Sequence, residues 1–155
     1  MSNDPHVNEQ KRIIMLDVPD RVRALERVPL LEGAPMEELY EIAERSHLLS
    51  FQPADVIVPE GEEGLGFYLV LAGRARVLRG GVEIDQLLPG GFFGEISLLE
   101  GQRRMATVVA AELTTCLGIL RSFFRPMLVR NPRIALRILE EERRRLGVVG
   151  QRTGA

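Results

Sequence analysis

The sequence has few of the residues that disulfides and metal centres require. Cys116 is the only cysteine among 155 residues, which excludes an intrachain disulfide framework and a thiolate cluster. His6 and His47 are the only histidines, whereas metal enzymes built on a β-barrel usually place two or three histidines around the ion. We therefore expect no metal, no metal-dependent catalysis and no iron–sulfur redox sensing.

Long apolar runs and an excess of one charge are also absent. The apolar runs are far shorter than the roughly 20 residues that a membrane-spanning helix needs, and the first residues, MSNDPHVNEQ, do not resemble a signal peptide. The 20 basic side chains nearly balance the 22 acidic ones, so no overall field attracts nucleic acid or an anionic membrane. These features favour a cytoplasmic protein whose ligand must be inferred from local sites.

The first part of the chain predicts a tail followed by two helices. Residues 1–19 are polar and broken by prolines, which is typical of a flexible N-terminal tail. The segment DRVRALERVPLLEG indicates a helix that is capped by Asp20 and ends near Pro29. A second helix has Pro35 in its first turn. The apolar face of that helix comprises Leu39, Ile42 and Ala43.

From His47 the pattern changes to short β-branched or aromatic runs separated by Gly, Pro and Asp. These runs read HLLSFQPADVIVPEG, GFYLVLAGRARVLRGG, VEIDQLLPGG and ATVVAAELTTCLGIL. Their spacing predicts a compact antiparallel barrel or jelly roll. The pair Gly80-Gly81, between two such runs, predicts a two-residue hairpin turn.

After Leu120 the helical period returns. The segment SFFRPMLVRN indicates a short helix with Ser122 as its cap. Pro132 then opens a longer helix, whose end is marked by Gly147. The residues expected on one apolar side of this helix are Ile134, Ile138 and Leu139.

Together these segments predict a mainly β fold, an antiparallel β-roll (jelly-roll barrel) with N-terminal helices and two C-terminal helices. We expect one domain over residues 20–147, with a flexible tail over 1–19 and a C-terminal tail over 148–155.

The segment FGEISLLEGQRRMATV places Glu95 directly after Gly94 and Arg104 nine positions further on. Taken alone, the two charges could simply pair to close a barrel loop. A short helix that starts after Gly94 would instead point backbone N–H groups near Ile96 and Ser97 towards an anion. Arg104 would add a planar guanidinium that suits two phosphate oxygens. The two charges alone favour the ion pair, and a phosphate-bearing ligand is favoured only when the flanking pattern is added.

The element order and three segments resemble the cyclic nucleotide-binding domain family, which includes the catabolite activator protein, the regulatory subunits of cAMP-dependent kinase and cyclic-nucleotide-gated channels. VPLLEGAPMEELYEIAE is similar to the family's helical lead-in. PEGEEGLGFYLVLAGRARV is similar to its strand pair, with Gly61 and Gly73 at the turns. FGEISLLEGQRRMATV resembles its phosphate-binding cassette, and the whole resemblance spans about residues 21–147.

The resemblance implies a site for a cyclic phosphate and a ribose. Glu95 would accept a hydrogen bond from the ribose 2′-hydroxyl, and Gly94 would let the backbone approach closely. The resemblance assigns the phosphate to Arg104 and to the backbone at Ile96, Ser97 and Met105. Arg103 precedes Arg104, so the assignment could slip by one, but counting back from Ala106-Thr107-Val108 favours Arg104.

The base side of the site is defined by fewer residues. Met105 stands where relatives that bind cGMP carry a threonine whose hydroxyl reaches the guanine amino group, so the resemblance favours cAMP over cGMP. The residues that would line the base are Val77, Ile84, Leu87 and, on the terminal helix, Arg145. The first three could also be ordinary core, and the arginine run 143–145 could be a solvated helix end.

We expect a stand-alone receptor for cAMP, with cGMP as the other possible ligand, that shifts its C-terminal helices on binding and catalyses no reaction. The alternatives are the sensor part of a transcription regulator, or a family member that binds no nucleotide and acts as a protein-interaction module. A DNA-recognition domain would need roughly 50 residues beyond Ala155, so we expect no nucleic-acid partner for this chain alone. A separate effector, or a second copy paired through the last helix, would receive the signal.

Overall fold

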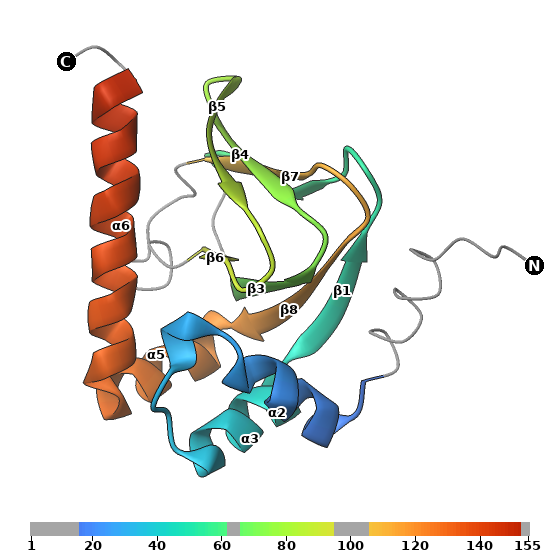
Figure 1. Cartoon of the computed structure of the whole chain (residues 1–155), viewed down its shortest axis with the longest axis vertical. Coiled ribbons are helices and arrows are strands. Elements are labelled where there is room, and N and C mark those ends of the chain that lie inside the picture. Colours follow the sequence, from blue (N-terminus) through green and yellow to red (C-terminus); the bar gives the residue numbers. More distant parts are fainter. Residues whose placement is uncertain (1–15, 62–65, 95–105, 153–155) are drawn as a thin grey trace, which may run out of the picture.

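The computed structural model describes residues 16–61, 66–94 and 106–152, without the side chains of 142 and 145–152. The described elements run from helices through two antiparallel sheets to further helices, as Figure 1 shows. This arrangement confirms the expected mainly β fold with flanking helices. None of the described helices is long and apolar enough to cross a lipid bilayer.

The chain is first described in helices α2 (Val18–Glu26), η1 (Pro29–Leu31) and α3 (Met36–Arg45). The cap of α2 is Asp17, whose Oδ1 accepts a 2.9 Å hydrogen bond from the backbone of Asp20. The prediction that Asp20 is the cap was therefore wrong, because Pro19 fits the first turn, where no backbone N–H is needed. Hydrogen bonding from Asp20 lowers the pKa of Asp17.

Helix α3 follows the predicted pattern closely. Pro35 lies one position earlier than expected, as the N-cap, with an extended backbone. Glu37 and Glu38 occupy the first turn, where carboxylates complement the helix dipole. The predicted apolar face is confirmed, since Leu39, Ile42 and Ala43 are buried.

Two four-stranded sheets form the roll. Their strands in chain order are β1 (His47–Phe51), β2 (Val56–Val58), β3 (Gly66–Ala72), β4 (Ala75–Arg79), β5 (Val82–Leu87), β6 (Phe92–Phe93), β7 (Thr107–Ala110) and β8 (Thr114–Leu120). The first sheet has the order β1-β8-β3-β6 and the second the order β2-β7-β4-β5. The predicted runs are thus confirmed as strands, and β6 is an addition that the periodicity did not indicate.

Glycines make the turns where the sequence placed them. Gly80 and Gly81 join β4 to β5 with φ of 57° and 80°, which confirms the hairpin and matches a turn with two left-handed residues. Gly61 and Gly73 also have positive φ, of 84° and 89°. A Cβ on Gly73 would lie 2.4 Å from the carbonyl oxygen of Leu113, so no other residue fits there without backbone movement.

The described residues contain two apolar clusters, one on each side of the first sheet. The helix-side core joins that sheet to the helices and contains a stack of three aromatic rings, in which Phe67 lies 5.6 Å from Phe92 and 4.3 Å from Phe124. The barrel-interior cluster lies between the two sheets. Its buried members are Val58, Val70, Ala75, Val77, Leu87, Phe93, Val108 and Cys116.

Two helices, α5 (Arg121–Arg130) and α6 (Pro132–Arg152), complete the described chain. Ser122 is not the cap of α5 as predicted; it is the second helical residue, because β8 ends at Leu120 and that extended residue leads directly into the helix. Pro132 opens α6 as predicted, but Gly147 does not end it. A glycine ends a helix only where it leaves the helical conformation, and α6 continues to Arg152.

The buried side of α6 is also narrower than predicted. Ile134 and Ile138 are buried in the helix-side core, whereas half of Leu139 is exposed. Neighbouring helical residues point about 100° apart, so Ile138 and Leu139 cannot both face a narrow contact. In Figure 1, α6 stands beside the roll, next to β5.

Candidate nucleotide-binding site

The barrel-interior cluster is lined by residues of both sheets and includes several small side chains. Phe51, Ile57, Tyr68, Ile84 and Ala106 pack against it and are only partly buried. Cys116 is a fully buried member of the cluster, and this burial raises the pKa of its thiol to about 12.

Strand β6 anchors the start of the cassette to both clusters. Phe92 belongs to the helix-side core and Phe93 to the barrel-interior cluster, because successive side chains of a strand point to opposite faces. The Phe93 ring stacks on Tyr68 with centroids 4.9 Å apart. Gly94 follows at once with φ of 94°, a conformation that suits its predicted role of close backbone approach.

The residues predicted to bind phosphate and ribose lie outside the described residues. This holds for Glu95, Ile96, Ser97, Arg104 and Met105. Both ends of their segment are nevertheless fixed at the barrel-interior cluster, by Phe93 before it and Ala106 after it. Ala106 then leads into β7, where the Thr107 hydroxyl accepts a 2.9 Å hydrogen bond from the backbone of Glu60.

The structure brings together three of the residues predicted to line a base. Val77 and Leu87 are buried in the barrel-interior cluster, and Ile84 packs against it. Arg145 lies on α6, and its side chain is outside the described part of the chain. Val77, Ile84 and Leu87 therefore share one apolar cluster, and their contact with a base stays a prediction.

Sequence reasoning missed a polar residue on the same wall. The register of β4 and β5 pairs Val77 with Asp85 and then shifts between Val77 and Leu78, so that Leu78 pairs with Glu83. Paired residues of an antiparallel ladder share a face of the sheet, so Asp85 lies on the face of Val77. Asp85 lies two positions before the buried Leu87 with no register shift between them, so it shares the face of Leu87, and the bulge at Ile84 changes the alternation only before Asp85.

Asp85 is joined to α6 by Arg144. Its Oδ2 accepts a 2.9 Å hydrogen bond from Arg144 Nη2, and its Oδ1 accepts a 2.8 Å bond from the backbone of Gln86. Arg144 also donates two bonds to Glu141 Oε1, of 2.6 and 3.0 Å. The hydrogen bond from Glu141, followed by that from Asp85, raises the pKa of Arg144 further above its ordinary value.

Arg137 joins the first half of α6 to η1. Arg137 donates to the backbone carbonyls of Leu30, at 2.9 Å, and of Pro29 and Glu32 around η1. Between these contacts and β5 lies a cavity of about 320 Å³, lined by the β5–β6 connection, η1, Glu141 and Arg144. Helix α6 is therefore held by Ile134 and Ile138 in the helix-side core and by the polar contacts of Arg137 and Arg144 around this cavity.

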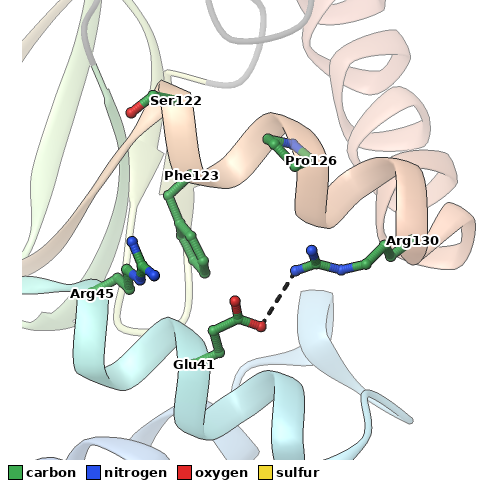
Figure 2. A pocket seen from close by; sticks show the side chains of 6 residues that line it. All are labelled: Glu41, Arg45, Ser122, Phe123, Pro126 and Arg130. Atoms are coloured by element: carbon green, nitrogen blue, oxygen red, sulfur yellow. Dashed lines mark hydrogen bonds and ion pairs between the residues drawn. The ribbon is translucent and has the colours of Figure 1, made fainter.

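A second hollow, of about 160 Å³, lies between α3 and α5 (Figure 2). Its lining residues are Glu41, Arg45, Ser122, Phe123, Pro126 and Arg130. The Arg45 guanidinium lies 5.3 Å from the centre of the Phe123 ring, and Arg130 forms a 3.3 Å ion pair with Glu41. Exposed pairs of this kind contribute about 0–1 kcal/mol each. We interpret this hollow as the seam that joins α5 to α3.

Comparison with known proteins identifies the class to which this site belongs. Residues 48–131 match the family model of the cyclic nucleotide-binding domain. The chain belongs to the cyclic nucleotide-binding domain family. This match confirms the resemblance to that family, and the relatives that the chain matches include regulatory subunits of cAMP-dependent protein kinase.

Two relatives and one solved structure illustrate the similarity. The chain is 37% identical over 86 residues to a cAMP-dependent protein kinase regulatory subunit of Hypocrea atroviridis, covering 56% of this chain and 19% of that protein. It is 43% identical over 72 residues to a cGMP-dependent protein kinase of Toxoplasma gondii, covering 46% of this chain and 7% of that protein. A structure described as "cAMP bound PfPKA-R (141-441)" aligns with a TM-score of 0.75 at 26% identity, covering 86% of this chain and 49% of that chain. The chain thus spans only a small part of the two kinase-related proteins.

Proposed function

We propose that this chain is a cAMP receptor that binds the nucleotide where the barrel-interior cluster opens towards the cassette, and that it catalyses no reaction. The observation that carries the proposal is the fixing of Phe93 and Ala106 in that cluster, at the two ends of a segment with Glu95 and Arg104 in the family's spacing. Membership of the family and the similarity to a cAMP-bound structure support it.

In this proposal each part of the ligand has its own partners. The phosphate is held by Arg104 and by backbone N–H groups at Ile96, Ser97 and Met105, as a short helix start would offer them. The ribose 2′-hydroxyl donates to Glu95. The purine packs on the apolar wall of Val77, Ile84 and Leu87, beneath α6.

Binding would be read out by α6. Ile134 and Ile138 hold the start of α6 in the helix-side core, and Arg137 and Arg144 add polar contacts, to η1 and to Asp85. Such contacts exchange more readily than a packed apolar interface, because water replaces them at little cost. A nucleotide that contacts the roll and α6 together would shift the population of α6 positions.

We also propose that α6 is the surface through which a second copy or an effector associates. Leu136 and Leu139 are 58% and 50% exposed and stand three residues apart, on neighbouring positions of the helix surface. Sedimentation velocity of the wild type and of Leu136→Glu, at several concentrations, tests self-association. A monomer at all concentrations for the wild type would leave an effector as the partner.

Titration calorimetry with cAMP, cGMP and AMP tests the main proposal. We expect one saturable site for cAMP, weaker binding of cGMP and no comparable binding of AMP, whose open phosphate carries a different charge and shape. The absence of heat with both cyclic nucleotides would overturn the proposal and favour a protein-interaction module.

Glu95→Gln adds a test of the ribose contact. The amide oxygen still accepts the 2′-hydroxyl, so cAMP should bind somewhat more weakly, and the discrimination against 2′-deoxy-cAMP should decrease because a neutral acceptor gains less. Equal affinity of the wild type for cAMP and 2′-deoxy-cAMP would show that Glu95 does not contact the hydroxyl.

A further inference from the structure

Glu60 joins three segments that are distant in the sequence. It lies in the turn after β2, and its carboxylate Oε2 accepts a 3.2 Å hydrogen bond from the backbone N–H of Gly80, in the turn between β4 and β5. The backbone N–H of Glu60 donates to the hydroxyl of Thr107 at 2.9 Å, at the start of β7. These bonds span 20 and 47 positions of the sequence, so they are tertiary contacts and not bonds within one turn.

Both ends of this bridge lead to parts of the proposed site. Thr107 opens β7 and stands three positions after Arg104 in the sequence. Gly80 joins the two strands that carry Val77 and Ile84, on which the purine would pack. The bridge therefore connects the strand that follows the phosphate-binding segment to the hairpin that carries the base wall.

The bridge lies where the strand ladders of the second sheet end. At this end of β7 the last described pairs are Val58 with Val108 and Leu78 with Thr107. The ends of paired elements open at a lower free-energy cost than their centres. By bonding to β7 and to the β4–β5 turn, Glu60 stabilises the end of the sheet at which the chain enters β7.

We propose that Glu60 is a positioning residue for the nucleotide, which holds the start of β7 in place relative to the β4–β5 hairpin. The inference rests on the proposed function, because it concerns the geometry of the same site. A guanidinium that binds two phosphate oxygens must be held to within about 0.5 Å. Loosening the strand that follows Arg104 should therefore weaken binding, although it removes no contact with the ligand.

Substitutions of Glu60 test the proposal, with the affinity for cAMP measured by calorimetry. The carboxylate is exposed, so its bond has the strength of one ordinary hydrogen bond, and Glu60→Ala should raise the dissociation constant about threefold to tenfold. Glu60→Gln keeps an acceptor oxygen and should bind cAMP within about twofold of the wild type.

The matched control is Asp55→Ala. The exposed Asp55 carboxylate also accepts a hydrogen bond from a backbone N–H, that of Gln52 at 2.8 Å, but these residues are only three positions apart. This variant loses the same kind of bond without breaking the bridge, so it should bind cAMP as the wild type does. Urea unfolding without ligand establishes that each variant is folded.

A double-mutant cycle tests whether the bridge acts as one unit. Thr107→Val keeps the shape of the side chain but removes the hydroxyl that accepts from Glu60. Breaking either end should interrupt the same connection, so the variant with both Glu60→Ala and Thr107→Val should bind hardly more weakly than either single variant. Two independent structural contributions would instead multiply their effects on the dissociation constant.

The outcomes separate this inference from the proposed function. A Glu60→Ala protein that binds cAMP as the wild type does overturns the role of Glu60 and leaves the cAMP site standing. The inference is also overturned if Glu60→Gln or Asp55→Ala loses as much affinity as Glu60→Ala, or if the two losses in the cycle multiply. A wild type that binds neither cAMP nor cGMP overturns both the inference and the proposed function.

Discussion

The helix-side core and the barrel-interior cluster share the first sheet but are built from different side chains. The first contains large residues with almost no exposure, including the stacked rings of Phe67, Phe92 and Phe124. Six of the eight buried residues that are described in the second are Val, Ala or Cys, and both clusters have partly buried apolar neighbours. Larger side chains therefore dominate the cluster on one face of the sheet, and smaller ones make up most of the cluster on the other. We infer that stability depends mainly on the first cluster and ligand binding on the second.

The largest effect should come from creating a cavity in the helix-side core. Phe124 is 1% exposed and stacks on Phe67 at 4.3 Å, so Phe124→Ala should lower the free energy of unfolding by about 3–5 kcal/mol. Val77→Ala removes two methylene equivalents and should lower the free energy of unfolding by only about 1.5 kcal/mol. Unlike Phe124→Ala, it should also weaken cAMP binding. Urea unfolding and calorimetry of both variants measure this. The comparison breaks if Phe124→Ala, still folded, weakens binding more than Val77→Ala.

The next effect concerns binding alone. Arg104→Ala should raise the dissociation constant of cAMP some thirty-fold to several-thousand-fold, because losing a charge-assisted partner of a buried phosphate costs about 2–5 kcal/mol. Its unfolding free energy without ligand should change little. Arg103→Ala is the matched control and should bind as the wild type does. The reverse pattern would place the phosphate contact at Arg103.

The burial of Cys116 in the barrel-interior cluster can be tested by measuring stability as a function of pH. Burial raises the pKa of Cys116 to about 12, from an ordinary value of 9.0. Between these values the unfolded thiol loses its proton while the folded thiol keeps it, so the stability falls as the pH rises, by about 1.4 kcal/mol per pH unit. Urea unfolding from pH 8 to 11 should show this slope relative to Cys116→Ala. Parallel curves for the two proteins would show that water reaches the thiol.

The smallest effect should separate the two nucleotides. Met105→Thr adds a hydroxyl that can reach the guanine amino group, and one neutral hydrogen bond contributes about 0.5–1.5 kcal/mol. From this position alone we expect the wild type to prefer cAMP by roughly threefold to tenfold, and the variant to bind cGMP more tightly with cAMP nearly unchanged. Competition of both nucleotides measures it. If the wild type prefers cGMP, residue 105 is not the selector.

Much of this architecture could be predicted because its signals are local. The hairpin turn between β4 and β5 requires two left-handed residues, which Gly80 and Gly81 supply. The family resemblance likewise depends on residue types at fixed spacing in one short segment. The bulge at Ile84 could not be predicted, because alternation cannot bring Ile84 and Leu87 to one cluster without the register shift between β4 and β5. The extent of α6 beyond Gly147 was also missed, since a glycine alone does not determine whether a helix stops.

Strand β6 offers two positions for a fluorescent reporter. Its two residues place one ring in each cluster, and the cassette begins immediately afterwards at Gly94. The sequence contains no tryptophan, so an indole introduced at Phe92 or at Phe93 would be the sole emitter of its kind. The emission wavelength and the quenching of the two single-tryptophan proteins would then report separately on the helix-side core and on the barrel-interior cluster. Two adjacent residues would thus show separately how a ligand changes the environment of each cluster.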